Sequence, residues 1–208
     1  MMYTPAQFRQ DDISTLHAAI RAAGLGTLVT FGADGLAATP VPMLLDPEPA
    51  PYGTLLGHLA RANPQWREAA PEVEALAMFL GPDAYITPSW YATKAETGEV
   101  VPTWNYVAVQ ARGPVSFFTE PEALLDVVRR LTERHEAGRP DPWAVADAPA
   151  AFIAAQLRGI VGFRLRITRL EGKWKMSQNR NAADRAGVVA GLRAEGHETV
   201  AALVKGEG

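Results

Sequence analysis

Five aromatic side chains with polar tips lie within 22 consecutive positions of this chain. They fall in two short segments, residues 85–91 and 101–106, each of which also carries a proline and hydroxyl groups. Tyrosine and tryptophan have apolar rings whose O–H or N–H group needs a hydrogen-bond partner when it is buried. On paired strands such residues build the wall of a pocket or the face of a dimer. The residues concerned are Tyr85, Trp90, Tyr91, Trp104 and Tyr106.

Common motifs for phosphate cradling and covalent catalysis are missing from the sequence. It contains no Gly-x-x-x-x-Gly-Lys, no Gly-x-Gly-x-x-Gly after a strand and no Gly-x-Ser-x-Gly, so Ser89 has no strong claim to be a nucleophile. There are no cysteines, and the four histidines lack the spacing of metal ligands. We expect His17 and His135 on helix surfaces, whereas His58 ends a predicted strand shortly before Arg61.

Composition and charge describe an ordinary globular protein. Apolar residues make up 48% of the chain and charged residues 21%, and no apolar run approaches the length of a membrane span. The N-terminus has no hydrophobic signal core, so we expect a cytoplasmic protein. The net charge of −3 gives no global argument for nucleic-acid binding.

The charge is nevertheless distributed unevenly. Residues 158–193 contain nine basic and two acidic side chains, a local charge of +7 that leaves −10 for the remainder. Such a window could bind a cofactor phosphate or DNA, or it could be a solvated strand face with helix ends. No convincing helix-turn-helix motif is present. The last two predicted helices are joined by a turn at Gly196, but the second has only Lys205 to face a phosphate backbone, which makes it a poor recognition helix.

Hydrophobic periodicity and turn residues predict the elements that must position these side chains. Helices are expected over residues 11–24, 121–136 (capped by Thr119), 148–157, 181–192 and 198–204, and a helix follows Asn63-Pro64. Strands are expected over residues 27–31, 36–45, 53–58, 75–80, 83–90, 100–118 and 161–176. Pro40 and Pro42 place the second strand at a sheet edge or at a bulge. Strands without βαβ alternation favour a mainly antiparallel barrel with peripheral helices.

Several motifs follow one another along the chain, at residues 2–8, 57–66, 81–91, 101–106, 175–180 and 184–192. In this order they resemble the motifs of the PaiB family, the FMN-binding negative transcriptional regulators. The resemblance covers nearly the whole chain and implies an FMN-binding split β-barrel of six antiparallel strands in a Greek-key arrangement. It also implies a homodimer with FMN at the dimer interface. We therefore expect a single domain over residues 1–208, with the barrel at about 24–176 and a helical extension at about 180–208.

The resemblance also implies a place for the flavin phosphate. In split barrels a strand followed by a basic turn and an Asn-Pro helix start holds this dianion, which needs cations and N–H donors. Here that element runs from His58 through Ala60 and Arg61 to Pro64. Arg61 is the first candidate for a phosphate contact and His58 the second. The alternative is that Arg61 caps the following helix or forms an ion pair with it.

The flat isoalloxazine ring would then lie along the proline-bearing segment 38–42. Thr39 and Val41 are the candidates there, with backbone contacts favoured over side-chain contacts, and an ordinary edge strand is the alternative. From the partner subunit, Trp104 could stack on the ring and Asn105 could hydrogen-bond to it, although Trp104 could equally be a core residue.

Polar side chains after the last long strand offer further contacts to the ring edge or the phosphate. Ser177 and Gln178 are candidates, and Lys175 adds a positive charge. A simple turn would explain Ser177 and Gln178 without a ligand.

Three functional hypotheses follow. The first is a dimeric FMN-binding regulator of transcription, and the second is a flavin-dependent oxidoreductase of the pyridoxamine-phosphate-oxidase-like or flavin-reductase-like class, since one fold hosts both. No general acid or base is evident, but a flavin carries hydride chemistry itself, so this absence argues only weakly against an enzyme. The third is a haem-binding relative, for which His58 is the one attractive ligand.

Overall fold

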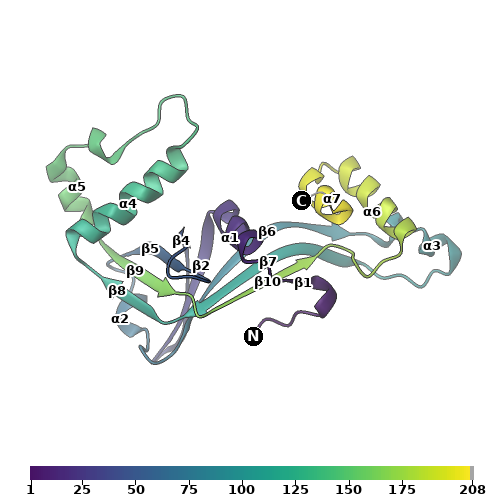
Figure 1. Ribbon diagram of the computed structural model, residues 1–208, viewed down its shortest axis with the longest axis horizontal. Coiled ribbons are helices and arrows are strands. Elements are labelled where there is room, and N and C mark those ends of the chain that lie inside the picture. The colour runs from purple at the N-terminus through teal and green to yellow at the C-terminus, as the bar shows by residue number, and fades with distance from the viewer. Residues whose placement is uncertain (207–208) are drawn as a thin grey trace. The chain divides into compact units, whose positions relative to one another are not determined.

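The computed structural model describes residues 1–206, which form two compact units (Figure 1). Of the described residues, unit 1 contains 1–12, 80–109 and 171–206, and unit 2 contains 13–79 and 110–170. The strands are β1 (Arg9–Gln10), β2 (Leu25–Gly32), β3 (Gly35–Pro42), β4 (Leu44–Asp46), β5 (Thr54–Ala60), β6 (Ala75–Ile86), β7 (Thr103–Gly113), β8 (Val115–Phe118), β9 (Ile160–Arg166) and β10 (Arg169–Lys175). The α-helices are α1 (Ile13–Ala23), α2 (Gln65–Glu68), α3 (Thr93–Glu96), α4 (Pro121–Glu136), α5 (Ala150–Leu157), α6 (Ala182–Ala194) and α7 (Glu198–Lys205), and 3-10 turns lie at Ala6–Phe8, Pro88–Trp90 and Val145–Asp147.

The strands form two sheets. The six-stranded sheet has the order β1-β10-β7-β6-β2-β3, and the four-stranded sheet has the order β4-β5-β9-β8. The strand pairs recorded in register run antiparallel, as in β2–β3, β5–β9 and β8–β9. Within residues 1–206 these pairings do not close the two sheets into one continuous barrel. Mainly antiparallel β-structure with peripheral helices confirms the predicted fold class.

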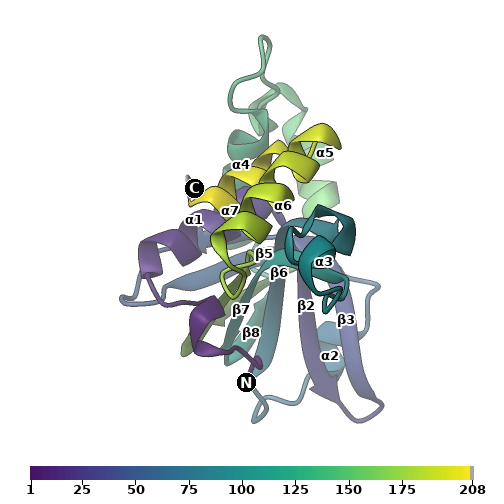
Figure 2. The ribbon, with the colours of Figure 1, turned by 90° about the vertical axis from the view of Figure 1, so that its right-hand side faces the viewer.

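The edge position of the proline-bearing strand follows from its sequence. β3 ends the order of the six-stranded sheet and pairs with β2 in a hairpin that closes at Gly32 and Gly35 (Figure 2). Proline has no N–H to donate, so a strand with Pro40 and Pro42 is tolerated where one side of its backbone needs no ladder partner. The prediction of an edge strand there is confirmed.

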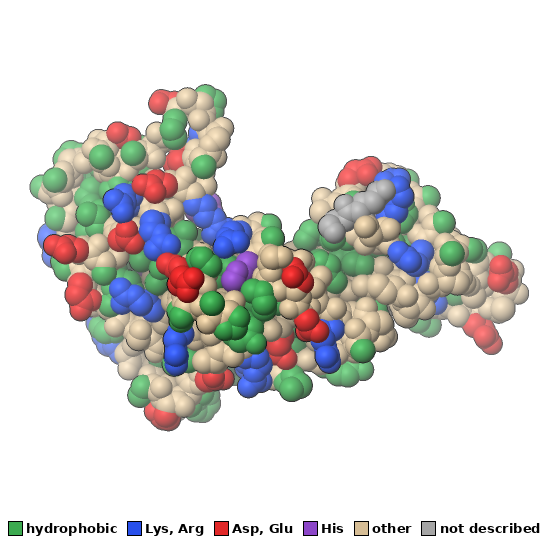
Figure 3. All heavy atoms as spheres, viewed as in Figure 1, with side chains coloured by type: hydrophobic (Ala, Val, Ile, Leu, Met, Phe, Trp, Pro, Cys, Tyr) green, Lys and Arg blue, Asp and Glu red, His purple; other side chains and the backbone are tan. Residues whose placement is uncertain are grey.

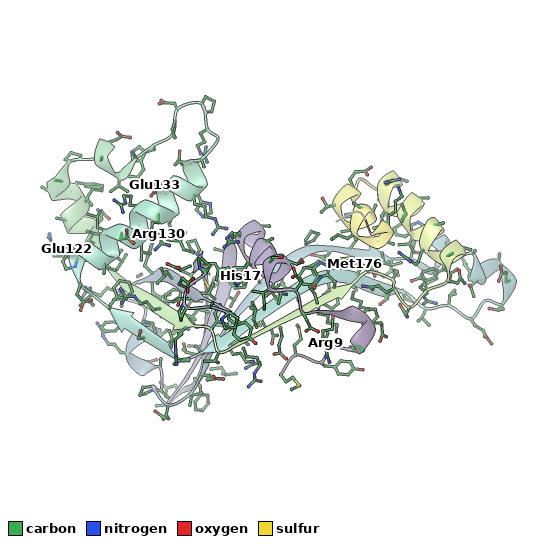
Figure 4. The ribbon with its side chains drawn as sticks, in the orientation of Figure 1. Arg9, His17, Glu122, Arg130, Glu133 and Met176 are labelled. Carbon is green, nitrogen blue, oxygen red and sulfur yellow. The ribbon has the colours of Figure 1, made fainter. Side chains whose placement is uncertain are left out.

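Each unit has its own hydrophobic cluster. In unit 1, helices α6 and α7 bury Val188, Leu192 and Val204 against Ile86 and Met176 (Figure 4). In unit 2, helix α4 buries Leu124, Val127 and Leu131 against Phe118 and Leu56. Acidic and basic side chains are interspersed on the surface of unit 2 in the view of Figure 3. On α4 they include the Arg129–Asp126 and Arg130–Asp126 ion pairs. None of the helices within residues 1–206 combines the length and apolar character that a membrane crossing requires.

Several strand predictions were wrong in their boundaries. Residues 36–45 do not form one strand, because β3 ends at Pro42 and β4 belongs to the other sheet. Residues 88–90, predicted as the end of a strand, form a 3-10 turn. Residues 75–86 form one strand, because Gly81-Pro82 continues β6 where we expected a break. Conversely, residues 100–118 form two strands that belong to different sheets, since Pro114 separates β7 from β8. Residues 161–176 likewise divide into β9 and β10, again in different sheets. Alternation of side chains continues across such a change of sheet and therefore does not reveal it.

Two side-chain predictions were also wrong. Thr119 does not cap α4, because Glu120 holds the N-cap position without a side-chain cap bond. His17 is not a surface residue, since only 7% of it is exposed and its Nε2 lies 3.0 Å from the carbonyl oxygen of Tyr52. Its neighbours Leu16 and Ile20 are buried on the same helix, and the imidazole satisfies a loop carbonyl beside them.

Candidate functional site

The turn between β5 and α2 is held by main-chain and side-chain hydrogen bonds on both sides of Arg61. The Arg61 amide donates to the carbonyl of Gly159 at 2.8 Å, and the Asn63 amide donates to the carbonyl of Ala60 at 2.9 Å. The indole N–H of Trp66 donates to the carbonyl of Arg61 at 3.1 Å. The backbone that carries the Arg61 side chain is therefore fixed in place.

The Arg61 guanidinium itself has no hydrogen-bond or ion-pair partner among residues 1–206. Its Nε atom is buried and makes no hydrogen bond, and no carboxylate within residues 1–206 forms an ion pair with it. The alternative of an ion pair with the following helix is therefore not what the structure shows. A buried donor without a partner is costly and calls for an acceptor from elsewhere. A phosphate supplies such an acceptor, because its charged oxygens match the guanidinium donors.

His58 and Ala60 lie on the strand that leads into this turn. His58 is half-buried and pairs in register with Gly162 of β9, while Ala60 is exposed and pairs with Ile160. Burial lowers the pKa of His58 below its ordinary value of 6.5. The imidazole is therefore neutral at pH 7, and it can offer a hydrogen bond to an anion but no positive charge.

The two candidates on β3 have different environments. Val41 is only 3% exposed, so its side chain belongs to the core and its backbone alone could meet a ligand. Thr39 is half-buried, and its hydroxyl donates to Oε1 of Gln65 at 2.6 Å while accepting from Nδ2 of Asn63 at 3.0 Å. Gln65 was not among the predicted site residues. Its place beside Asn63-Pro64 within the 57–66 motif was the available signal.

Trp104 and Asn105 point to opposite faces of β7 in unit 1. Trp104 is 53% exposed and meets Tyr85 edge-on, with ring centroids 6.1 Å apart and an interplanar angle of 67°. Trp104 is thus not a core residue, which was the alternative for it. Asn105 is fully buried, and its Nδ2 donates to Oγ of Ser177 at 3.0 Å.

The remaining polar candidates make contacts within their own turn or with the neighbouring strand. Ser177 is 3% exposed, and its backbone has a positive φ of 60°, which residues other than glycine rarely adopt. The Gln178 amide donates to the carbonyl of Trp174 at 2.6 Å and accepts from the amide of Met176 at 2.7 Å. Lys175 donates to the hydroxyl of Thr103. A turn stabilised by its own side chains describes these residues well.

The predicted site residues thus form two groups, one in each unit. Thr39, Val41, His58, Ala60 and Arg61 belong to unit 2, and Trp104, Asn105, Lys175, Ser177 and Gln178 belong to unit 1. The first group offers an unpaired guanidinium beside an edge strand, and the second offers an exposed aromatic surface. No group of three or more His, Cys, Asp or Glu side chains in the described part of the chain is arranged to hold a metal ion.

Comparison with known sequences gives matches over nearly the whole chain. The family described as "Putative FMN-binding domain" matches residues 2–169. Protease synthase and sporulation protein PAI 2 of Bacillus subtilis is 33% identical, with 93% of this chain and 90% of that protein covered. An uncharacterized protein of Aspergillus fumigatus is 35% identical, with 98% of this chain and 95% of that protein covered.

Comparison with solved structures shows the same fold in more distant proteins. The FAD and heme binding protein from Mycobacterium smegmatis superposes with a TM-score of 0.62 at 16% identity, covering 88% of this chain and 80% of that one. The flavocytochrome Anf3 from Azotobacter vinelandii gives a TM-score of 0.61 at 13% identity, covering 86% of this chain and 75% of that one. At these identities the likeness concerns the fold alone.

Proposed function

This chain belongs to the PaiB family, the FMN-binding proteins related to PAI 2 of Bacillus subtilis, and from that premise we propose that it is a homodimeric, FMN-binding negative regulator of transcription. The observation that carries the flavin site is the Arg61 guanidinium, whose Nε is buried without a partner at the end of β5. The FMN phosphate provides the acceptor that this donor lacks among residues 1–206.

The residues present fit the rest of FMN as well. Neutral His58 and the exposed residue Ala60 precede Arg61 on the phosphate side. The backbone of Thr39 and Val41 on the edge strand offers hydrogen bonds to the ring edge. Trp104 of the partner subunit supplies an aromatic surface for the ring. Asn105, Lys175, Ser177 and Gln178 lie in the same unit as Trp104, and their hydrogen bonds join β7 to the end of β10 and to the turn that follows it. When bound, the flavin supplies electron and hydride transfer, and this chain supplies binding and orientation.

An uncovered apolar sheet face in unit 2 supports the homodimer. Phe31 and Leu36 are opposite each other in the β2–β3 register and are 47% and 77% exposed, and Leu25 on the same strand is 57% exposed. Val29 and Ala38 form another cross-strand pair on this face. Contiguous exposed apolar surface on a folded protein is typical of an interaction site. A second copy that covers the face would bring a second set of site residues to the same assembly.

We place the regulatory role in the cytoplasm, where a repressor meets its DNA. The basic window proposed for DNA is divided between the units, with residues 158–170 in unit 2 and 171–193 in unit 1. Phosphate contacts by such residues make affinity fall steeply as salt rises. The protein should therefore bind, at low salt, a DNA duplex taken from upstream of its own gene. Absence of binding at low salt would remove direct DNA contact from the proposal.

The flavin site is tested by titrating FMN and riboflavin into the flavin-free protein and following visible absorbance. Arg61→Ala should weaken FMN binding by about tenfold to a hundredfold, the range for a lost hydrogen bond to a charged group, and should change riboflavin binding far less because riboflavin has no phosphate. Arg129→Ala is the matched control, since Arg129 is an exposed arginine of the same unit and pairs with Asp126 on α4. Equal losses for both flavins would refute the phosphate contact.

A further inference from the structure

Three side chains at the edge of unit 2 form a closed ring of hydrogen bonds. The Thr39 hydroxyl donates to Oε1 of Gln65 at 2.6 Å and accepts from Nδ2 of Asn63 at 3.0 Å. Oδ1 of Asn63 accepts from the backbone amide of Gln65 at 3.0 Å, which completes the ring. Each donor in the ring faces an acceptor, so the hydroxyl of Thr39 has one orientation in which both of its bonds are satisfied.

Gln65 ties this ring to the β2–β3 hairpin. Its side-chain amide nitrogen donates to the carbonyl of Leu28 on β2 at 3.1 Å and to the carbonyl of Ala37 on β3 at 3.3 Å. Gln65 is only 1% exposed, and a buried amide with all of its bonds made rigidifies the elements that it joins. The first residue of α2 is thereby fixed to the edge strand.

The same ring controls the turn that carries Arg61. The backbone N–H of Asn63 donates to the carbonyl of Ala60 and closes the turn, and the Trp66 indole N–H donates to the carbonyl of Arg61. Asn63 and Trp66 lie on either side of Gln65 in the chain, so a shift of Gln65 would move both contacts. The direction of the Arg61 guanidinium therefore depends on side chains that do not themselves approach an anion.

We propose that Gln65 is a positioning residue for the flavin phosphate. Thr39 acts with Gln65 as a positioning residue, and its side chain does not contact the isoalloxazine. This inference rests on the proposed FMN site at Arg61. Its chemical content is that the Thr39 hydroxyl is committed to Gln65 and Asn63, so the edge strand offers FMN its backbone alone. Loss of the hydrogen-bond ring should then weaken recognition of the phosphate more than recognition of the isoalloxazine.

The experiment compares Thr39→Val, Thr39→Ser and Gln65→Met with the wild-type chain. Dissociation constants for FMN and riboflavin are measured for each, and exchange of the Trp66 indole proton is followed by NMR in flavin-free protein. Thr39→Val and Gln65→Met should lower the preference for FMN over riboflavin about tenfold, as expected when buried hydrogen-bond partners are lost, and should speed the indole exchange. Thr39→Ser keeps the hydroxyl and should show the wild-type preference for FMN and the wild-type rate of indole exchange. Thr54→Val is the matched control, because its hydroxyl donates to the carbonyl of Glu48 at 3.0 Å at the opposite end of β5.

The outcomes separate this inference from the proposed function. A wild-type chain that binds FMN no better than riboflavin would refute the phosphate site and this inference with it. A wild-type preference that Thr39→Val and Gln65→Met leave intact would overturn the positioning role alone. If Thr39→Val weakened the binding of FMN and riboflavin equally, Thr39 would contact the isoalloxazine and the positioning role would be refuted. If the Trp66 indole proton exchanged at the wild-type rate in Thr39→Val and Gln65→Met, the hydrogen-bond ring would not hold the turn that carries Arg61.

Discussion

Three arginines in the described part of this chain have a buried Nε without a hydrogen-bond partner, yet their side chains differ. Arg112 also donates through another nitrogen to Oε1 of Gln110 at 3.4 Å, and Arg185 donates to the carbonyl of Val204 at 2.6 Å. Arg61 has no such bond from any of its guanidinium nitrogens to the part of the chain that the structure describes. An orphaned atom within an otherwise anchored side chain reflects imperfect packing, whereas an unanchored guanidinium on a fixed backbone is suited to an external anion.

His58 gives a prediction for the pH dependence of stability. Burial lowers its pKa in the folded chain below the ordinary value of 6.5, so the unfolded chain binds the proton more readily. The stability linked to His58 is therefore present above pH 6.5 and is lost as the pH falls from there towards the folded-state pKa. Urea unfolding between pH 5 and 8 should show a steeper acid-side loss for wild type than for His58→Gln. Parallel profiles would mean that His58 titrates as an exposed imidazole. The interval from pH 5 to 8 brackets the ordinary histidine pKa of about 6.5.

Packing between elements depends on a glycine in α6. A Cβ added to Gly191 would lie 2.2 Å from a ring atom of Trp90, so the helix approaches the indole too closely for any larger residue. Alanine in a helix interior is ordinarily more favourable than glycine by up to about 1 kcal/mol. Here Gly191→Ala should lower the free energy of unfolding by about 1–3 kcal/mol, the cost of overpacking.

A second background isolates the cause of that loss. With Trp90→Leu already present, Gly191→Ala should be neutral or stabilising, because the ring that it would strike is gone. Urea denaturation of the four proteins in the cycle measures this coupling directly. An equal loss in both backgrounds would assign the effect to something other than the Trp90 contact.

Elements with local signals were predictable from the sequence, and elements defined by long-range pairing were not. The helix over residues 121–136 and the hairpin around Gly32 and Gly35 follow from periodicity and turn residues, and the structure contains both. The division of residues 161–176 into β9 and β10 depends on which sheet each half joins. Side-chain alternation has the same period in either sheet, so it carries no information about that choice.

The candidate site shows the same limit at its individual residues. The resemblance indicated the turn with Arg61, and the structure adds that the Arg61 guanidinium is unpaired. Gln65 was missed, because a glutamine at the first turn of a short helix usually faces solvent. Its burial depends on carbonyls of Leu28 and Ala37, residues far from it in the chain. Pairings of this kind arise only when distant segments meet.

At the scale of the whole molecule, the proposed site needs more than one group of residues. Arg61 and the edge strand lie in unit 2, and the exposed Trp104 lies in unit 1. A homodimer supplies a second copy of each group, and the apolar face of the β2–β3 hairpin is a surface on which it could form. Association and flavin binding should therefore be linked, since a ligand that binds only the assembled state stabilises it by mass action.

Breaking the hairpin face tests that linkage. Phe31→Lys together with Leu36→Lys places two like charges opposite each other on exposed positions of β2 and β3. Because both side chains are largely exposed, the hairpin should fold, but burial of two charges against a second copy would be prohibitive. Sedimentation should show a monomer whose FMN affinity is lower by at least about tenfold, as for the loss of a partner's aromatic contact. Leu125→Lys on α4, another exposed leucine of unit 2, is the control and should remain dimeric with wild-type affinity. A double variant that still sediments as a dimer would exclude this face as the interface, and a monomer with undiminished FMN affinity would show that one chain completes the site.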